Sequence, residues 1–477
     1  MTGSKIDYQA LHNVAIWGYG REGQSSLDWI RKHAPQARIT ILSDNRLCLE
    51  DYEQTHCNHL YGGEALKALC DGRFDLVIKS PGISNYRPGI SQAKRNGVRF
   101  TSATNLWFEA HTDSFKVAVT GTKGKSTSAM LLRFLLERAG KDVQIFGNIG
   151  LPMLGREPGA DVTVLELSSY QIADLSWGVD VALVTNIYPD HLPWHDDDEE
   201  RYYQDKLRLL SLKPDCRVIA NAGVQMLKDR ISDQAHVTWF NDSNRGYRVC
   251  DGKLLCDDDI LDVSNYPLKG DHNLVNLAGV CAVLDQLGVD PRPLLPDLGA
   301  FVQLPHRLEH FTRPDGILCI NDSIATVPES TIAALETLKS EKEGQCIFLI
   351  LGGAEREQDY QVLYNYLQHM PPSQVSGLYL LPENGQRMLE EMKNHPMSAK
   401  IAQALPQDVP EQSVAQDRLT VTICADLKQA IDQCLVRAVP GDIILLSPAA
   451  PSFGQFRNFE HRGQTFKALC LGEWTGH

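Results

Sequence analysis

Short apolar runs alternate with longer segments of helical periodicity in the first part of the chain. NVAIW and RITIL are rich in β-branched residues, and the helix-like segments SSLDWIRKHA and GISQAKRNG follow such runs. This alternation is typical of a parallel sheet covered by helices on both faces. We therefore predict a doubly wound, Rossmann-like α/β domain over residues 1–114.

The alternation starts again at VAVTG and continues through VTVLE and CRVIANA. RGYRVCDGKLLC has the pattern of a β-hairpin, and the apolar spacing of HNLVNLAGVCAVLDQLG predicts the last helix of this series. We predict a second α/β domain over residues 115–312.

A third series begins at GILCINDS and runs through TIAALETLKS and CIFLILGG to DIILLSPAA. It predicts a C-terminal Rossmann-like domain over residues 313–477. A chain of 477 residues is long enough for several domains of ordinary size. The expected fold class is α/β, with three α/β domains in tandem.

Composition and charge narrow the classes of partner. The formal net charge is −14, whereas recognition of a nucleic acid backbone needs a basic face. The twelve cysteines include no C-x-x-C pair, the N-terminus has no signal-peptide pattern, and no apolar run reaches 18 residues. We expect a cytoplasmic monomer with buried thiols that acts on small molecules and binds neither nucleic acid nor membrane.

The first glycine cluster has the pattern of a nucleotide site. Gly18, Gly20 and Gly23 in GYGREG follow a predicted strand, and Asp44 ends the next strand. Glycines let a phosphate approach the backbone, and the acid can bind a ribose hydroxyl. The pattern supports a nicotinamide dehydrogenase, another nucleotide site, or a plain glycine turn.

The segment VAVTGTKGKST joins a predicted strand to a predicted helix. Gly121 and Gly124 leave room for an anion, Lys125 supplies a positive charge, and Ser126 or Thr127 offers a hydroxyl to Mg²⁺. The glycine spacing departs from the standard phosphate loop, and a structural turn with solvated lysines is the alternative. We predict an ATP loop in a P-loop-like central domain.

Several residues outside this loop allow both functional and structural interpretations. Glu166 ends a strand and can hold Mg²⁺ or cap the next turn. Lys206 can be functional or simply exposed. His191 and His195 suggest zinc, but Pro193 disfavours a helical pair and no third ligand is evident.

Two pairs of polar residues near the predicted domain boundary are equally ambiguous. Asn273 and Asn276 open a predicted helix, as capping residues or as nucleotide ligands. Arg307 and Asp322 can form a surface ion pair or belong to a site.

Taken together, these motifs resemble the Mur ligases, whose ATP loop, shared with folylpolyglutamate synthases, reads G-T-x-G-K-[ST]. Nine further segments match in order along nearly the whole chain: SPGI at 80–83, GNIG at 147–150, LELSSYQ at 165–171, DHLPWH at 190–195, DKLRL at 205–209, HNLVN at 272–276, LPHRLE at 304–309, NDSIAT at 321–326 and SPAAPSFGQFRNFEHRG at 447–463. Within the family the chain is most similar to the members that add glutamate to UDP-N-acetylmuramoyl-L-alanine in peptidoglycan synthesis.

The resemblance implies an ATP-dependent, ADP-forming ligase that makes an amide bond through an acyl phosphate. It implies ATP and two Mg²⁺ ions as cofactors, with Lys206 carbamylated by CO₂. The implied catalytic residues are Lys125, Glu166, His191 and Lys206, and the implied metal ligands are Ser126, Glu166, His191 and carbamylated Lys206.

The resemblance also implies three binding groups. ATP would be bound by Gly121, Thr122, Lys123, Gly124, Lys125, Ser126, Thr127, Asn273, Asn276, Arg307 and Asp322. The UDP-substrate would be bound by Gly20, Arg21, Asp44, Arg46, Ser80, Pro81, Gly82 and Asn148. Glutamate would be bound by Thr326, Arg356, Ser452 and Phe459, of which Thr326, Ser452 and Phe459 read equally as a helix cap, a loop hydroxyl and a core aromatic residue.

Three segments depart from the pattern of the D-glutamate-adding members. Ile324 stands where those members have a lysine, Arg356 is the nearest substitute for a second lysine, and SPAAPSFG replaces SPACASLD. Losing a cation beside a dicarboxylate alters its recognition. The segments IWGYGREG, VIKSPGISNYRP, GTKGKST, NDSIAT and SPAAPSFG resemble the variant branch that adds L-glutamate, and D-glutamate is the alternative.

Three other classes of function compete with this one. A dehydrogenase leaves GTKGKST, Glu166 and Asp322 without a role. A regulator without turnover does not account for the joint presence of Lys125, Glu166, His191 and Lys206. A folylpolyglutamate synthase does not account for SPGI and GYGREG.

Overall fold

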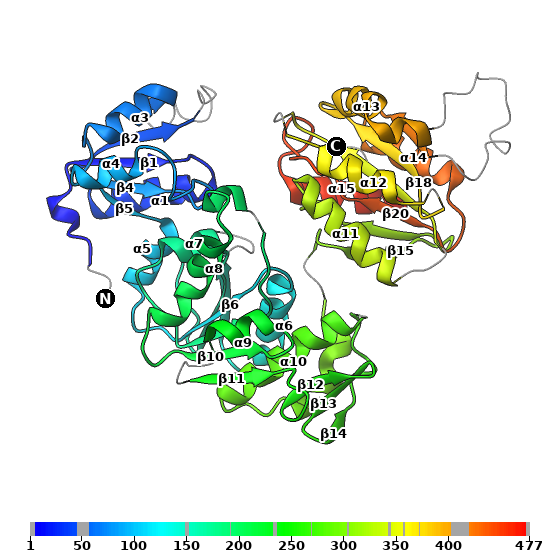
Figure 1. The fold of residues 1–477 in the computed structure, drawn as a ribbon, viewed down its shortest axis with the longest axis horizontal. Helices are drawn as coiled ribbons and strands as arrows, with labels where there is room; N and C mark the ends of the chain where they lie inside the picture. Colours follow the sequence, from blue (N-terminus) through cyan, green and yellow to red (C-terminus); the bar gives the residue numbers. More distant parts are fainter. Residues whose placement is uncertain are drawn as a thin grey trace. The chain divides into compact units, whose positions relative to one another are not determined.

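The computed structural model describes residues 5–44, 57–147, 152–190, 192–231, 236–268, 270–302, 305–341, 345–355, 358–371, 373–401 and 419–473. The chain divides into two compact units, residues 1–301 and 302–477. The first unit contains two parallel sheets, and the second contains one large sheet (Figure 1). The predicted α/β class is confirmed, while the predicted boundaries at 114 and 312 stay predictions.

The first sheet has five parallel strands in the order β3-β2-β1-β4-β5. The chain leaves β1 in one direction for β2 and β3 and returns to the other side for β4, so the loops after β1 and β4 lie at a topological switch point, where open α/β sheets bind ligands. The strands are β1 Asn13–Trp17, β2 Arg38–Ser43, β3 Asn58–Tyr61, β4 Leu76–Lys79 and β5 Arg99–Thr101; the helices are η1 Tyr8–Ala10, α1 Arg21–His33, α3 Gly62–Cys70, α4 Ile90–Arg95 and α5 Ala103–Ala110.

The second sheet has six parallel strands in the order β11-β10-β9-β6-β8-β7. Strands β6 and β8 are buried along their whole length, as expected for a parallel sheet covered on both faces. The strands are β6 Lys116–Thr120, β7 Val143–Gly147, β8 Val162–Glu166, β9 Val181–Val184, β10 Arg217–Asn221 and β11 Val237–Phe240.

Helices and a small antiparallel sheet complete the first unit. The predicted hairpin is confirmed as β12 and β13, to which β14 adds a third strand. The helices are α6 Lys125–Arg138, α7 Ser169–Asp174, η3 Leu192–His195, α8 Glu199–Leu207, η4 Arg208–Ser211, α9 Gln225–Ile231, α10 Asp271–Gln286 and η5 Arg292–Ala300; the small sheet is β12 Tyr247–Cys250, β13 Lys253–Cys256 and β14 Asp259–Leu261.

The second unit has a six-stranded sheet in the order β15-β16-β20-β17-β18-β19, in which only β15 is antiparallel. The strands are β15 Glu309–Thr312, β16 Leu318–Asn321, β17 Ile347–Gly352, β18 Val375–Leu381, β19 Thr420–Ile423 and β20 Ile443–Leu446; the helices are α11 Pro328–Glu341, α12 Gln361–His369, α13 Gly385–Asn394, η6 Pro396–Lys400, α14 Leu427–Arg437 and α15 Phe459–Leu471. Apolar side chains of β17, β18 and β20 form the core.

The structure bears on two expectations from composition, the lack of a membrane-spanning helix and the burial of the thiols. Within the described residues, no helix combines the length and apolar character needed to cross a membrane. Six of the eleven described cysteines are buried and none forms a disulfide, but Cys250 is exposed. The expectation of buried thiols therefore holds for only part of the set.

Candidate active site

The loop after β6 has a shape that only glycine permits at two positions. Gly121 has φ +148° and Gly124 has φ +79°. A Cβ on Gly121 would overlap the Thr185 hydroxyl, and a Cβ on Gly124 would overlap the Asn276 side-chain oxygen. Both glycines are therefore required by packing within the protein, and Asn276 of α10 packs directly against the bend at Gly124.

The loop is held by side chains that follow β9. The Asn186 Oδ1 atom accepts hydrogen bonds from the backbone N–H groups of Thr122 and Lys123, at 3.1 and 2.9 Å. The Thr185 hydroxyl donates to the Lys123 carbonyl oxygen at 2.7 Å. The Thr122 hydroxyl pairs with Tyr202 at 2.8 Å. These bonds hold the loop through groups of the protein itself.

Helix α6 begins directly after this loop and has the features of an anion site. Gly124 is its N-cap and provides no side-chain hydrogen bond, so the first turn directs backbone N–H groups outward. Lys125 lies at the first position, where its amine bonds the Thr122 carbonyl oxygen at 2.9 Å. The predicted strand–turn–helix arrangement is confirmed, and its dipole favours a bound phosphate.

Lys206 lies on α8 and is buried beneath the loop. Its side chain is 3% exposed, and its amine donates to the Gly121 carbonyl oxygen at 2.8 Å. Burial, together with the nearby Lys125 charge, lowers the pKa of Lys206 well below its usual value. The interpretation of Lys206 as a solvent-exposed lysine is therefore wrong.

Glu166 ends β8, next to β6, and its side chain is fully buried. Ser168 caps the following helix α7 through a capping box with Gln171. The interpretation of Glu166 as a cap is therefore wrong. The same holds for Asn273 and Asn276, because the N-cap of α10 is Gly270 and both asparagines lie inside the helix.

A cavity of about 400 Å³ connects the two halves of the first unit. The residues that line it include Arg21, Pro81 and Gly82, from the group predicted to bind the UDP-substrate. They also include Thr122 and Lys125 from the predicted ATP loop, together with Lys206. The structure therefore brings parts of two predicted sites, far apart in sequence, to one cavity.

The glycine cluster of the first sheet packs tightly against the loop after β4. Gly18 has φ +91°, and a Cβ there would lie 2.6 Å from the Ser80 hydroxyl, which itself donates to the Gly18 carbonyl oxygen at 3.1 Å. Gly20 is the exposed N-cap of α1. Asp44 follows β2 and pairs with Arg87 at 2.9 Å. Gly20, Ser80 and Asp44 thus lie at or beyond the carboxyl edge of the first sheet.

Sequence reasoning missed the carboxyl and amine groups that support this cavity. Lys79 and Asp174 form a buried ion pair at 2.9 Å, and Asn85 also donates to Asp174 at 2.8 Å. Glu22 lines the cavity, and burial followed by the Asp174 charge raises its pKa to about 7. Charged residues within apolar strand and helix patterns were the only available signal.

In the second unit, Asp322 follows β16 and is buried. It accepts hydrogen bonds from the Ser447 hydroxyl at 2.8 Å and from the Leu308 backbone N–H at 3.3 Å. Burial raises the pKa of Asp322 to about 7, although the Ser447 bond and the Arg307 charge oppose the shift. The surface-pair interpretation of Arg307 and Asp322 is therefore wrong.

The described residues predicted to bind glutamate, Thr326, Ser452 and Phe459, lie on loops and a helix start of the second unit. The Gln358 side chain donates to the Thr326 carbonyl oxygen at 2.9 Å, which holds the loop after β17 beside Thr326. Ser452 is buried in the loop after β20, and Phe459 is the half-buried first residue of α15, not a core aromatic residue. The Phe459 carbonyl oxygen accepts from the Ser323 hydroxyl at 2.8 Å.

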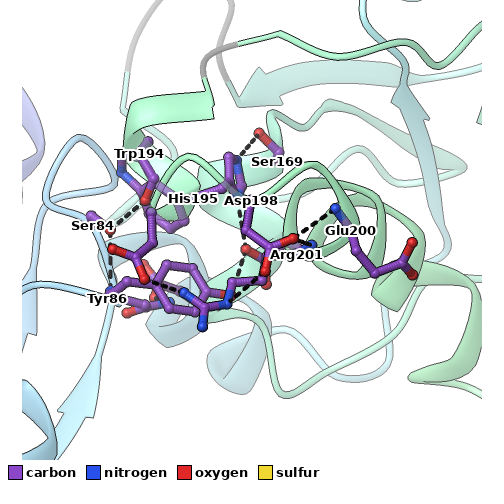
Figure 2. A network of polar contacts seen from close by, with 12 residues as sticks. Ser84, Tyr86, Ser169, Trp194, His195, Asp198, Glu200 and Arg201 are labelled. Atoms are coloured by element: carbon purple, nitrogen blue, oxygen red, sulfur yellow. Dashed lines mark hydrogen bonds and ion pairs between the residues drawn. The ribbon is translucent and has the colours of Figure 1, made fainter.

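Four predicted site residues lie outside the described residues: Arg46, Asn148, His191 and Arg356. His195 is described, lies at the end of the short helix η3 and is fully buried (Figure 2). It bonds Asp205 and Ser169, and the described parts of the chain contain no cluster of three His, Cys, Asp or Glu side chains able to hold a metal. These contacts favour the non-zinc interpretation of the segment HLPWH.

The groups beside the loop fit Mg²⁺ bound together with a nucleotide. The Ser126 hydroxyl oxygen is buried without a hydrogen-bond partner. Glu166 provides a buried carboxylate at the end of the neighbouring strand. Hydroxyl and carboxylate oxygens are typical Mg²⁺ ligands, and Mg²⁺ commonly takes one or two of them together with phosphate oxygens and water. This donor set therefore suits magnesium better than zinc.

Comparison with known proteins adds independent information. The family model described as Mur ligase middle domain matches residues 119–284, and the model described as Mur ligase, glutamate ligase domain, matches residues 306–450. A UDP-N-acetylmuramoyl-L-alanine--L-glutamate ligase of Xanthomonas euvesicatoria pv. vesicatoria is 33% identical over 471 residues, which cover 96% of this chain and 94% of that protein. The chain belongs to the Mur ligase family.

Solved Mur ligases share the fold at low sequence identity. The UDP-N-acetylmuramate-alanine ligase of Thermotoga maritima has a TM-score of 0.54 and 16% identity, covering 96% of this chain and 98% of that one. The MurF ligase of the same organism, solved in complex with ADP, has a TM-score of 0.52 and 15% identity, covering 98% and 99%. The expected three-domain α/β fold of this family is thus confirmed.

Membership in the Mur ligase family makes the chain an ATP-dependent ligase. The predicted enzyme class is therefore confirmed. The dehydrogenase hypothesis and the hypothesis of a regulator without turnover are both wrong.

Proposed function

We propose that this Mur ligase joins UDP-N-acetylmuramoyl-L-alanine to L-glutamate in peptidoglycan precursor synthesis, with ATP converted to ADP and phosphate. The observation that carries the proposal is that one cavity is lined by Arg21, Pro81 and Gly82 on one side and by Lys125 and Lys206 on the other. UDP-N-acetylmuramoyl-L-alanine would span this cavity, with its nucleotide end at the first sheet and its carboxylate end at the ATP loop.

The UDP end belongs at the carboxyl edge of the first sheet. Gly20 and Arg21 begin α1, where backbone N–H groups and the helix dipole favour a diphosphate. Asp44 and Arg46 are proposed to hold the uridine, and Ser80 keeps the glycine turn in place. Asn148 is proposed to contact the acyl end of the same substrate.

The alanyl carboxylate attacks the γ-phosphorus of ATP, which forms an acyl phosphate and releases ADP. A free carboxylate is a poor acyl donor, and phosphate is a good leaving group. Lys125 neutralises negative charge on the transferred phosphoryl group, and the Gly121–Gly124 loop positions it. The nucleotide is further held by Thr122, Lys123, Thr127, Asn273 and Asn276 in the first unit.

Ser126 and Glu166 are proposed to hold Mg²⁺, with His191 and a carbamate on Lys206 as further ligands of a two-ion site. When bound, Mg²⁺ neutralises charge on the phosphate oxygens. Formation of the carbamate needs a neutral amine, whose nitrogen bonds to CO₂ while one proton is lost. The buried environment of Lys206 favours its neutral form.

The glutamate amine then attacks the acyl phosphate, and the tetrahedral intermediate expels phosphate to leave an amide. Thr326, Arg356, Ser452 and Phe459 are proposed to bind the amino acid. The altered segments around Ile324, Arg356 and Ser452 favour the L-isomer, and the Xanthomonas relative named above is itself called an L-glutamate ligase.

The decisive experiment supplies purified protein with ATP, Mg²⁺, UDP-N-acetylmuramoyl-L-alanine and either L- or D-glutamate. Amide product and phosphate are measured together. We expect turnover with L-glutamate and at least tenfold less with D-glutamate. Turnover with D-glutamate alone overturns the stereochemical assignment, and no amide with either isomer overturns the proposed reaction.

A further inference from the structure

A chain of hydrogen bonds links Ser169, His195 and Asp205, which come from three separate segments. The His195 Nδ1 atom lies 2.8 Å from the Asp205 Oδ2 atom, and the His195 Nε2 atom lies 3.2 Å from the Ser169 hydroxyl. Figure 2 shows the His195 ring with one edge toward Ser169. Nothing in the reaction proposed above uses these three residues.

The hydrogen-bond partners of Asp205 define which atoms donate and which accept between Asp205, His195 and Ser169. Asp205 also accepts a hydrogen bond from the Tyr86 hydroxyl at 3.0 Å. A carboxylate only accepts, so the His195 Nδ1 atom carries the hydrogen of this bond. In the neutral imidazole the Nε2 atom is then an acceptor, and the Ser169 hydroxyl donates to it.

Donation to His195 fixes the orientation of the Ser169 oxygen. Ser169 lines the cavity that also contains Lys125 and Lys206. Its proton is directed toward His195, so its lone pairs remain to accept a hydrogen bond from the cavity. The neighbouring Ser168 is different, because its hydroxyl is engaged in the capping box with Gln171.

A neutral acceptor suits the surroundings of this reaction. The cavity also contains the carboxyl groups of Glu22 and Asp190, and Asp190 pairs with Lys123 at 3.6 Å. A further carboxylate near the phosphates would repel them, whereas a hydroxyl oxygen accepts an N–H without adding charge. Amide formation brings two N–H groups to the reacting carbon: the incoming amine and the amide of the alanyl group.

We propose that the Ser169 oxygen accepts a hydrogen bond from a substrate N–H during amide formation, and that His195 and Asp205 are positioning residues that orient it. The inference rests on the proposed function, because that reaction supplies the N–H groups. An unsupported hydroxyl rotates, and a buried histidine held by a partly buried carboxylate removes that freedom, as supporting hydrogen bonds do at other sites.

The kinetic test compares wild-type protein with Ser169→Ala, Ser169→Cys and His195→Gln, all with ATP and Mg²⁺ present. Thiol sulfur is a weak acceptor, so Ser169→Cys removes the acceptor while filling the space. Ser211→Ala is the matched control, since the Ser211 hydroxyl bonds the Arg208 carbonyl oxygen on an exposed turn. Thermal melts establish which variants are folded.

Loss of one hydrogen bond should lower kcat/KM about five- to tenfold in the Ser169 variants. If the amine is the donor, the KM for L-glutamate rises and less than one amide forms per phosphate. If the alanyl amide is the donor, the Kd of UDP-N-acetylmuramoyl-L-alanine, measured calorimetrically without ATP, rises instead. Either result supports the proposal.

His195→Gln should move the same parameter in the same direction, and Ser169→Ala/His195→Gln should be no worse than Ser169→Ala. Folded Ser169 variants within twofold of wild type overturn the inference, as does an additive double variant. Absence of amide with the wild-type protein instead overturns the proposed function, so the two failures are distinguishable.

Discussion

The Lys206 amine donates to the Gly121 carbonyl oxygen at 2.8 Å, across 85 positions of sequence. This bond fastens α8 to the loop in which the predicted nucleotide residues lie. It also keeps the amine in a buried environment that disfavours its charged form.

Removal of CO₂ and bicarbonate should lower kcat at least about tenfold, and added bicarbonate should restore it, because the carbamate on Lys206 is proposed to complete the metal site. Incubation with ¹³C-bicarbonate should give one carbamate carbon signal by NMR. Lys206→Arg should lose that signal and the exposed-lysine variant Lys141→Ala should keep it. A signal that persists in Lys206→Arg contradicts the assignment.

Lys125→Ala should lower kcat at least about 100-fold, because the lysine charge acts on the transferred phosphoryl group. Phosphate release under saturating substrates is the measurement. Lys141→Ala removes an exposed lysine beyond the end of the same helix and should leave kcat unchanged. A near-normal rate for Lys125→Ala would falsify the ATP-loop assignment.

Gly124→Ala should destabilise the protein more than Gly140→Ala. Both glycines have nearly the same positive φ, +79° and +77°, so each alanine incurs a strain of about 1–2 kcal/mol. Only Gly124→Ala also places a Cβ on Asn276, whereas the space at Gly140 is open. Denaturant unfolding should therefore separate the two variants, and equal losses would refute the packing argument.

Lys79→Met should lower the free energy of unfolding by about 3–5 kcal/mol, because it leaves the Asp174 carboxyl buried without its cation. The double variant Lys79→Met/Asp174→Leu should recover much of that loss. The pair Lys67 and Asp71 lies on the surface, and Lys67→Met should change stability little. Similar effects of Lys79→Met and Lys67→Met would contradict the role of burial.

Asp322→Asn should be less destabilising at pH 7.5 than at pH 5. The pKa of Asp322 is about 7 in the folded protein and about 3.9 in an unfolded chain, so the folded state holds an extra proton between those values. Stability from this group is present at low pH and is lost as pH rises toward 7. Denaturant unfolding at the two pH values should show a difference on the order of 2 kcal/mol.

Asp315→Asn serves as the control for this pH dependence. The Arg313 side chain, by hydrogen bonding, lowers the pKa of Asp315. The stability that this exposed carboxyl contributes therefore changes with pH in the opposite direction to that of Asp322. If the loss of stability in Asp322→Asn and in Asp315→Asn changed with pH in the same direction, Asp322 would not hold an extra proton in the folded protein.

The local parts of the fold were predictable from sequence because their signals are local. Alternating β-formers followed by GTKGKST predicted β6, the loop and α6, and RGYRVCDGKLLC predicted the hairpin of β12 and β13. Long-range contacts were not predictable. Nothing in the spacing of Gly124 and Asn276 indicates that their atoms touch, and capping preference gave an equally good account of the asparagine.

The same limit applies to polar residues that are buried by the fold. Lys79 and Asp174 belong to different segments, and only the packed structure makes them a pair. Likewise, Ser169, His195 and Asp205 become a chain of hydrogen bonds only when η3 and α8 fold against α7. Their residue types were visible, but their partners were not.

Three consecutive residues after β4 limit which segments of this enzyme can be exchanged with those of another ligase. Ser84 bonds the Trp194 carbonyl oxygen, Asn85 bonds Asp174, and Tyr86 bonds Asp205. A chimera that takes only its first sheet from another ligase would lose all three bonds unless the donor carries the same side chains. Exchange of substrate specificity between such enzymes therefore requires transplanting the first sheet together with α7, η3 and α8.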